Sequence, residues 1–239
     1  MLGMRVEPHS VDSIIHAVKR GARGMDIVED NADRWRFTKS LFLLNDSYKS
    51  ANWHKETVNL KLFERPDNWP ERDPLVRIMA WVLMSNHFHL LLQEKTEGGI
   101  TKFMQRLCGS MSLCFNIKYD SKGSIFQGAY KAKKVDDDSY LRYLTFYIQV
   151  KNVLELYPGG LVVALKNFDQ AWDWALKYPF SSLPAYVLGE VSPILDDVEG
   201  LMNEIHNKIF SKEDAYELLK SYIEKSDIWS DRLDELTLK

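Results

Sequence analysis

The longest stretch of the chain without a charged side chain runs from Ile78 to Gln93. It is shorter than the roughly 18 to 20 apolar residues that cross a bilayer. Ser85 and Asn86 interrupt it, and apolar residues flank them on both sides. This pattern predicts two strands, over residues 76–83 and 87–92, joined by a short hairpin connection. The stretch therefore predicts a β-hairpin and no membrane partner.

The rest of the chain shows a mixture of strand and helix patterns. Acidic residues precede two of the predicted helices, and glycines precede a third, as expected where helices begin. In chain order, the apolar spacing predicts a strand over 13–19, a helix over 31–45, a helix to about residue 118 with Thr101 as its N-cap, an extended segment over 123–135, a helix over 140–156, and helical segments near 168–177 and 213–225.

The charges are unevenly distributed along the chain. Its 239 residues are 45% hydrophobic, enough for one substantial core, and the formal charge of −3 gives no hint of a nucleic-acid partner. Residues 101–134, however, contain seven Lys or Arg and one acid, whereas residues 190–239 contain 13 acids and six bases. The basic segment suits a groove that follows a nucleic-acid backbone, and equally a solvated charged face.

Two histidines in the second strand of the hairpin are candidates for metal binding. Side chains alternate between the faces of a strand, so His87 and His89 point to the same side while Phe88 points to the other. A pair of neutral imidazoles can share a divalent metal and leave positions for water, a carboxamide and phosphate oxygens. Two histidines at this spacing are a weak signal alone, and their setting in an uncharged strand strengthens it.

Tyrosines on a later predicted helix are candidates for covalent chemistry. Tyr140, Leu144, Tyr147 and Lys151 are spaced by four, three and four residues, which places them on one helix face. A phenol on such a face can pack into a core, or it can attack a phosphodiester and form a phosphotyrosine. The phenol needs a metal or a base nearby, because its ordinary pKa is near 10.

Together these motifs resemble the single-tyrosine HUH transposases, and more narrowly the REP-associated tyrosine transposase branch of the insertion-sequence-200-like group. The order and spacing of the motifs are similar over about residues 12 to 195. The segments that carry the resemblance are RGARGMDIVEDNADRWRF (20–37), MSNHFHLLL (84–92), FMQRL and FN.KY within 103–119, GSIFQGAYKAKKV (123–135), YLRYLTFYIQVKN (140–152) and YPFSSLPAYVLGE (178–190).

The resemblance implies an α+β fold with a ferredoxin-like or RRM-like antiparallel sheet flanked by helices, the HUH palm. The transposase domain is expected over residues 1–160 and a helical C-terminal extension over 161–239. By the same resemblance, His87 and His89 are ligands of Mg²⁺ or Mn²⁺ and Tyr147 is the nucleophile. The implied reaction cleaves and rejoins single-stranded DNA at hairpin-bearing ends through a 5′-phosphotyrosine.

The sequence departs from the family at the third metal ligand. Related enzymes place Gln or Asn four residues after the tyrosine, and this chain has Lys151 there. Asn152 follows one residue later, and Gln149 is expected to project elsewhere. Either the helix is locally shifted so that Asn152 reaches the metal, or Lys151 has a different role, as a phosphate contact or proton donor.

Further residues are expected to bind DNA, and the resemblance implies single-stranded or hairpin DNA as the partner. Glycines after the first strand permit a tight turn in which arginines can hold phosphates, and aromatic and basic residues are interleaved after the long basic helix. Relatives act as homodimers or as monomers, and both stay open here. The expected location is the cytoplasm, with nucleoid association through DNA. The candidate DNA-binding residues are Arg20, Arg23, Gln105, Lys131, Lys133, Lys134 and Lys151.

Three functions remain as alternatives. The first is an active transposase, favoured by His87, His89 and Tyr147. The second is a domesticated or catalytically impaired DNA-binding regulator of repeat elements, favoured by Lys151 at the third-ligand position. The third is a metal-dependent phosphohydrolase that uses water directly and forms no covalent adduct.

Overall fold

A four-stranded antiparallel sheet lies at the centre of the molecule. The computed structural model describes residues 10–196, 200–209 and 211–237. The strands are β1 (Ile14–Arg20), β2 (Val76–Leu83), β3 (His87–Glu94) and β4 (Lys131–Lys134), in the spatial order β2-β3-β1-β4. The predicted hairpin is confirmed as β2 and β3, and the predicted strand 13–19 as β1.

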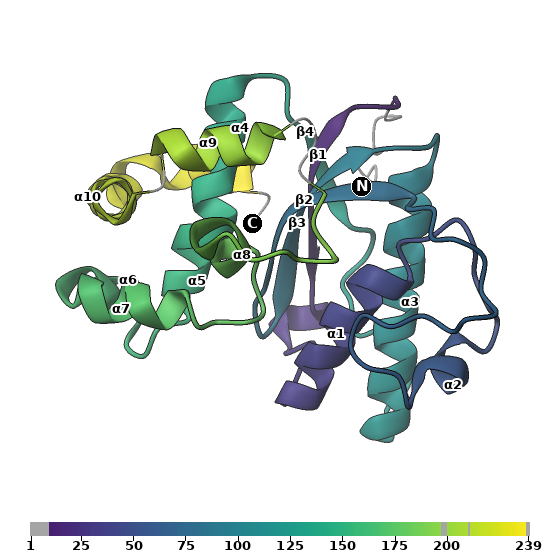
Figure 1. Ribbon diagram of the computed structural model, residues 1–239. Helices are drawn as coiled ribbons and strands as arrows, with labels where there is room; N and C mark the ends of the chain where they lie inside the picture. Colours follow the sequence, from purple (N-terminus) through teal and green to yellow (C-terminus); the bar gives the residue numbers. More distant parts are fainter. Residues whose placement is uncertain (1–9, 197–199, 210, 238–239) are drawn as a thin grey trace.

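Helices α1 (Asn31–Leu43) and α3 (Gly99–Lys118) pack on one face of the sheet, with the short helices η1 (Ala22–Gly24) and α2 (Trp53–Thr57) in the connections (Figure 1). The chain order strand, helix, strand, strand, helix, strand with this sheet order is the split βαβ arrangement. The expected ferredoxin-like antiparallel sheet with flanking helices is therefore confirmed.

The other face of the sheet is covered by a second helical layer (Figure 1). No helix in the described ranges is long and apolar enough to cross a membrane. The layer consists of α4 (Asp138–Phe146), the π-helical turn η2 (Tyr147–Lys151), α5 (Asn152–Glu155), α6 (Gly160–Lys166), α7 (Phe168–Ala175), α8 (Leu183–Leu188), α9 (Leu201–Ile209) and α10 (Lys212–Thr237).

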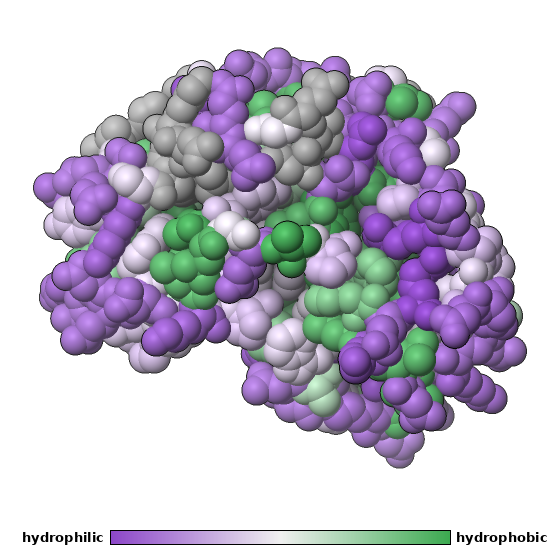
Figure 2. Space-filling view, in the orientation of Figure 1, coloured by the Kyte–Doolittle hydropathy of each residue, from purple (hydrophilic) through white to green (hydrophobic). Residues whose placement is uncertain are grey.

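Strand alternation produces two separate cores, one on each face of the sheet. Phe88, Leu90 and Leu92 of β3 pack against α1 and α3. His89 and Leu91 face the second helical layer, where Leu91 joins its core. On the side seen in Figure 2, hydrophilic side chains cover most of the surface and apolar ones gather toward its middle.

Helix α3 begins two residues before the predicted N-cap. Gly98, with φ of 70°, is the N-cap in place of Thr101, and a Cβ on Gly99 would approach the Leu75 carbonyl oxygen to 2.3 Å. The buried Glu94 carboxylate accepts the Ile100 N–H at 3.3 Å, which supplies the cap. The sequence prediction missed this because the capping carboxylate comes from the end of β3, outside the helix.

Two predicted segments near the second helical layer also differ from the structure. Within the extended segment 123–135, only Lys131–Lys134 forms a strand, at the edge of the sheet beside β1. The single helix expected over 140–156 begins at Asp138, passes through the turn η2 and ends at Glu155.

The free edge of β2 is covered by segments from the C-terminal third of the chain. The Leu83 N–H donates to the Phe180 carbonyl at 3.0 Å, and the Ser182 N–H donates to the Trp81 carbonyl at 2.9 Å. Farther along, the Asp196 N–H donates to the Ile78 carbonyl at 3.0 Å. The motif at residues 178–190 therefore protects an edge strand whose backbone groups would otherwise be unpaired.

Ser182 completes this edge with its side chain, and its loss should destabilise the fold. The buried hydroxyl accepts the Trp81 N–H at 3.0 Å, so Ser182→Ala leaves a buried donor without its partner. We expect the free energy of unfolding to fall by about 1–3 kcal/mol in urea denaturation. Ser181→Ala is the matched control, because the Ser181 hydroxyl reaches only the Tyr178 carbonyl at 3.5 Å. Equal effects of the two variants would contradict this role.

Candidate functional site

The two candidate metal-binding histidines lie on the sheet face that carries the second helical layer. In the β1–β3 register, His89 is paired with Val18 and His87 with Arg20, so these four side chains share one face. The rings of His87 and His89 are 4.9 Å apart between centroids and nearly perpendicular, at 76°. His89 is buried and His87 is half-buried.

Each histidine is held at its Nδ1 atom. The His87 Nδ1 lies 2.6 Å from the Asn86 Oδ1, and the Asn86 amide nitrogen donates to the Gly24 carbonyl at 3.3 Å. The His89 Nδ1 lies 2.9 Å from the Nε2 of His16, a fully buried residue of β1. Burial, and secondarily the positive charge of Lys133, lowers the pKa of His16 to about 3. With Nδ1 engaged on both rings, Nε2 is the nitrogen that each can offer to a metal.

Three loops meet at the end of the sheet beside these histidines. The Gly21 N–H donates to the Asn86 carbonyl at 2.7 Å, and the Gln127 N–H donates to the Arg20 carbonyl at 2.9 Å. Gly21 is required at this crossing, because a Cβ there would come within 2.0 Å of the Met25 carbonyl oxygen. The backbone therefore brings the turn after β1, the β2–β3 connection and the segment before β4 together.

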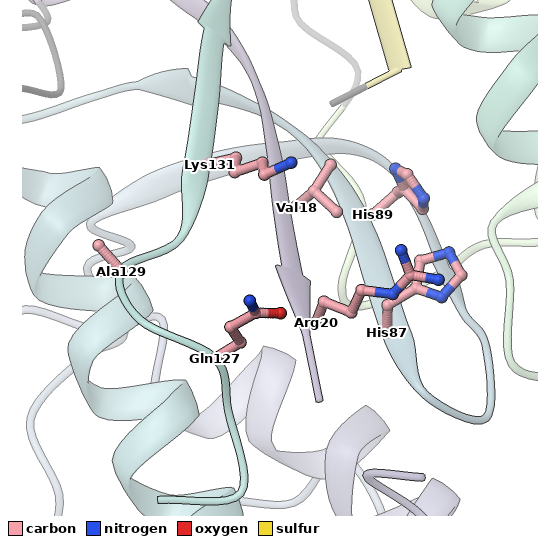
Figure 3. A pocket seen from close by; sticks show the side chains of 7 residues that line it. All are labelled: Val18, Arg20, His87, His89, Gln127, Ala129 and Lys131. Carbon is pink, nitrogen blue, oxygen red and sulfur yellow. The ribbon is translucent and has the colours of Figure 1, made fainter. Parts of the chain in front are cut away.

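A cavity of about 350 Å³ opens where these loops meet (Figure 3). Lys19 extends to the opposite side of β1 and donates to the Gly128 carbonyl, which ties down the loop that forms one wall. Arg20 and Lys131 give the cavity a cationic lining around the two imidazoles (Figure 3). The lining residues are Val18, Arg20, His87, His89, Gln127, Ala129 and Lys131.

Tyr147 lies directly against the histidines from the second helical layer. Its ring is 5.5 Å from that of His89 between centroids, at an interplanar angle of 77°. The Tyr143 ring stacks on its other side at 6.1 Å. Tyr147 is 0% exposed, and it is absent from the cavity lining. A substrate in the cavity would therefore reach the Tyr147 hydroxyl only after a local movement.

A π-helical turn begins at Tyr147 and changes which residue lies one turn below it. The Asn152 N–H donates to the Tyr147 carbonyl, a bond between residues five apart instead of four. This wider turn brings position +5 to the place that position +4 occupies in an α-helix. The helix is therefore locally widened after Tyr147, while the Lys151 Nζ lies 5.0 Å from the centre of the Tyr147 ring.

The side chains after Tyr147 are buried beside it. Asn152 and Gln149 are each 0% exposed, and within the described residues the Asn152 Nδ2 and both amide atoms of Gln149 have no hydrogen-bond partner. Buried carboxamides without partners are uncommon and often mark a place for water, an ion or a ligand. The Asn152 Oδ1 accepts a hydrogen bond from the Lys151 Nζ at 3.3 Å.

Lys151 is almost completely buried, at 1% exposed, and makes several contacts. Its Nζ pairs with the Glu155 carboxylate at 2.6 Å and lies 5.0 Å from the centre of the Tyr147 ring. Tyr222 of α10 lies on another side, 5.6 Å from the same Nζ. Sequence reasoning missed Glu155 and Tyr222, because nothing local to residue 151 indicates that a helix 70 residues later covers it.

The sequence that forms this site matches a known protein family. The family model described as "Transposase IS200 like" matches residues 41–151, which include β2, β3, α3, β4 and the tyrosine-bearing turn. Over these residues the chain is similar to the IS200-like transposases. The expected family resemblance is thereby confirmed at this level.

Two further comparisons accompany the family match. Among solved structures, this chain is similar to one described as a REP-associated tyrosine transposase bound to a REP hairpin. The TM-score is 0.42 at 14% sequence identity, over 81% of this chain and 90% of that chain. Comparison with curated protein sequences gives no significant match.

The structure brings together only part of the expected DNA-binding set. Arg20 and Lys131 line the cavity, and Lys133 lies on the same sheet face, paired in register with His16. Lys133 places its Nζ 4.7 Å from the centre of the Tyr140 ring. Arg23 is exposed in the turn after β1, with a left-handed φ of 56°.

Two of the expected DNA-binding residues lie away from this face. Lys134 is paired in register with Ile15 on the α1 and α3 side and forms an ion pair with Asp136 at 3.0 Å. Gln105 is exposed on α3, which packs on that opposite side. Neither residue reaches the cavity, because strand alternation and the position of α3 direct both away from it.

The basic segment 101–134 does not form one continuous groove. The Lys118 Nζ pairs with Asp30 and Asp33 at 2.7 Å each, and Arg106 donates to the Asp46 carbonyl. These two bases therefore support the α1 and α3 layer. The bases that face the cavity come from β4 at the end of the segment.

The donor set near the cavity fits a divalent metal with few protein ligands. In the described part of the chain, no group of three or more His, Cys, Asp or Glu is placed to hold a metal ion. The two histidine Nε2 atoms and a carboxamide could hold one, with further positions left for substrate oxygens. Asn152 directly follows the turn η2, and its Oδ1, the atom that would bind a metal, accepts a hydrogen bond from the Lys151 Nζ at 3.3 Å.

Proposed function

We propose that this protein cleaves and rejoins single-stranded DNA at hairpin-bearing ends through a covalent phosphotyrosine on Tyr147. One observation carries the proposal. The Tyr147 ring packs against His89, which shares its strand face with His87, and each histidine is held at Nδ1. A nucleophile beside two imidazoles that offer the same nitrogen is an arrangement suited to phosphoryl transfer.

The proposed reaction between Tyr147 and the DNA strand needs no further reactant. The phenolic oxygen forms a bond to phosphorus, the bond from phosphorus to the 3′ oxygen breaks, and the phenolic proton passes to the departing 3′ oxygen. The products are a 5′-phosphotyrosine and a free 3′ hydroxyl, which can reverse the step on another end. The bond energy is conserved in the phosphotyrosine, so rejoining requires no nucleotide cofactor.

His87 and His89 are proposed to hold one Mg²⁺ or Mn²⁺ ion through Nε2. Bound there, the ion would act as a Lewis acid that polarises the phosphoryl group and stabilises the leaving oxygen. Arg20 and Lys131 line the same cavity and are proposed to hold the flanking phosphates, Arg20 as a bidentate donor. Most of the rate gain in such a reaction comes from positioning and electrostatics.

Asn152 is proposed as the third protein ligand, in place of the residue that relatives carry four positions after the tyrosine. The turn η2 supports this assignment, because its one extra residue per turn compensates for the one extra residue in the sequence. In this proposal Lys151 is not a ligand. Its ion pair with Glu155 places its charge beside the Tyr147 ring, where it would favour the phenolate.

Replacing Asn152 tests the assignment of the third ligand. Asn152→Ala should weaken Mn²⁺ binding on the order of tenfold or more, since it removes one of three protein ligands. Gln149→Ala is the matched control: it removes a second buried carboxamide, two residues after Tyr147, without removing a proposed ligand. Mn²⁺ affinity is measured by titration of the free ion with electron paramagnetic resonance. A loss in Gln149→Ala and none in Asn152→Ala would assign the ligand to Gln149.

Burial of Tyr147 adds a requirement to the proposed reaction. The side chain is covered by the second helical layer, with Lys151 and Tyr143 in contact with its ring. Tyr222 of α10 covers Lys151 in turn. DNA binding must therefore be accompanied by a movement of η2 or of α10 that brings the hydroxyl to the phosphate.

The proposed substrate is a DNA hairpin with a single-stranded flank. The similar solved structure is described as bound to a REP hairpin, and the family resemblance implies the same class of partner. The same resemblance supports the REP-associated branch, a cytoplasmic location with nucleoid association, and either a monomer or a homodimer.

End-labelled DNA tests the proposed function. Three substrates of equal length are compared in Mn²⁺, in Mg²⁺ and in EDTA: a hairpin with single-stranded flanks, an unstructured strand and a full duplex. We expect a protein–DNA adduct that survives denaturing electrophoresis, only with the flanked hairpin and only with metal. The second product should carry a 3′ hydroxyl that a polymerase can extend. Cleavage without an adduct would indicate a phosphohydrolase instead.

The second candidate function is a DNA-binding regulator without cleavage activity. The ion pair of the buried Lys151 with the exposed Glu155, at the position where relatives carry a metal ligand, is the observation that favours it. In the same experiment, this candidate predicts retention of the hairpin in native gels with no cleaved product at any metal concentration.

A further inference from the structure

His16 is a buried residue of β1 outside the sequence motifs, and its side chain contacts His89 of the candidate metal site. It is 0% exposed in the middle of β1, two positions before Val18, the register partner of His89. Its Nε2 lies 2.9 Å from the His89 Nδ1, and the two rings lie in nearly parallel planes, 16° apart, with 5.2 Å between their centroids. Parallel rings and a direct ring-to-ring hydrogen bond leave His89 little freedom to rotate.

We propose that His16 is a positioning residue that fixes the tautomer and ring orientation of His89. The inference rests on the proposed function for the identity of the metal ligand, and the contact itself stands on the geometry. A single proton lies between the two facing nitrogens. When His89 carries that proton on Nδ1 and donates it to His16, its Nε2 presents a lone pair to the cavity. The opposite direction would place the His89 proton on Nε2 and block metal binding.

The geometry around His16 holds its ring in place for this bond. Its side chain is fully buried in β1, and Lys133 is its register partner on β4. Among the described groups, the His16 Nδ1 has no hydrogen-bond partner, so the bond to His89 is the polar contact that orients the ring.

His87 is also held at its Nδ1 atom, by a different partner. Its Nδ1 faces the Asn86 Oδ1 at 2.6 Å, and Asn86 is itself oriented by its bond to the Gly24 carbonyl. Both candidate ligands are therefore held at Nδ1 by a neutral acceptor, from the adjacent residue for His87 and from the neighbouring strand for His89. Outer partners of metal-bound histidines typically contribute 10- to 100-fold in metal affinity or activity.

Two substitutions separate the hydrogen bond from the packing. His16→Leu fills the space without an acceptor, whereas His16→Gln can offer its Oε1 to the His89 Nδ1–H. We expect Mn²⁺ affinity, measured by electron paramagnetic resonance, to fall about 10- to 100-fold in His16→Leu and to stay within about threefold of wild type in His16→Gln. Circular dichroism and thermal unfolding report whether each variant folds. Equal Mn²⁺ affinity in folded His16→Leu and wild type would overturn the proposal.

A metal-free measurement distinguishes this proposal from the proposed function. Long-range ¹H–¹⁵N spectra of the wild-type protein without metal assign the tautomer of His89, and we expect the proton on Nδ1. A proton on Nε2 would overturn the positioning role even if the wild-type protein forms the covalent DNA adduct. Conversely, the Nδ1 tautomer in a protein that forms no adduct would retain the positioning role and reject the proposed reaction.

Discussion

Replacing Tyr147 by phenylalanine is expected to abolish the covalent protein–DNA adduct and to lower strand cleavage about a thousandfold or more. The substitution removes only the hydroxyl oxygen that would attack phosphorus. The ring contacts with His89, Tyr143 and Lys151 are all made by atoms that phenylalanine retains. Binding of the DNA hairpin should therefore be unchanged, and labelled hairpin DNA in Mn²⁺ measures both quantities.

Tyr143→Phe is the matched control for this experiment. Tyr143 lies one turn earlier on α4 and stacks on Tyr147, and burial raises the pKa of its hydroxyl above the ordinary value. The Tyr147 ring lies against His89, whereas Tyr143 stacks on the ring of Tyr147, so Tyr143→Phe should keep most of the cleavage activity. Full adduct formation by Tyr147→Phe would contradict the assignment of the nucleophile.

Removal of either proposed metal ligand should have the second large effect. His87→Ala and His89→Ala each delete one of two imidazoles, and a bound metal contributes several kcal/mol to transition-state stabilisation. Loss of that contribution corresponds to a fall in cleavage rate on the order of 10³-fold. We expect hairpin binding to stay close to wild type, since Arg20 and Lys131, which line the same cavity, are the proposed phosphate contacts. Gel-shift and cleavage assays on the same samples separate the two effects.

His54→Ala controls for the general effect of losing a histidine. His54 belongs to α2, on the opposite side of the sheet from the cavity, and its Nε2 contacts Arg36 at 2.5 Å. Its removal should leave cleavage and Mn²⁺ affinity unchanged. Wild-type cleavage by both His87→Ala and His89→Ala would show that the metal assignment is wrong.

The parts of the fold that local patterns determine could be predicted from the sequence. Strand alternation in 76–92 and helical spacing in α1 and α3 identified these elements to within a few residues. Alternation also placed His87 and His89 on one face, and they are indeed adjacent. These predictions succeeded because hydrophobic periodicity is dictated by the burial of one face of each element.

Contacts between distant segments could not be predicted in this way. Residues 180–182 cover the edge of β2 through backbone hydrogen bonds that any residue can make. No side-chain pattern therefore predicts this contact. His16 shows no signal in the sequence of β1, because its role depends on the register with β3. Gln105 was assigned to the DNA-binding set from its place in a basic segment, and the direction of α3 away from the cavity required the tertiary structure.

The sequence predicted the turn η2 only as one of two alternatives. The position of Asn152, five residues after Tyr147, raised the alternative of a local helix shift. The sequence alone could not choose between that shift and a new role for Lys151, because a π-helical turn is stabilised by tertiary packing more than by the preferences of its residues. The hydrogen bond from the Asn152 N–H to the Tyr147 carbonyl now shows the shift.

Mass spectrometry of the covalent adduct tests the central claim most directly. Trypsin cleaves after Arg142 and Lys151, so a single peptide spanning residues 143–151 contains both Tyr143 and Tyr147. After reaction with hairpin DNA in Mn²⁺ and nuclease digestion, fragmentation of this peptide locates the nucleotide. The proposed function predicts a 5′-phosphate linkage on Tyr147. A nucleotide on Tyr143, or on any residue outside this peptide, would contradict it.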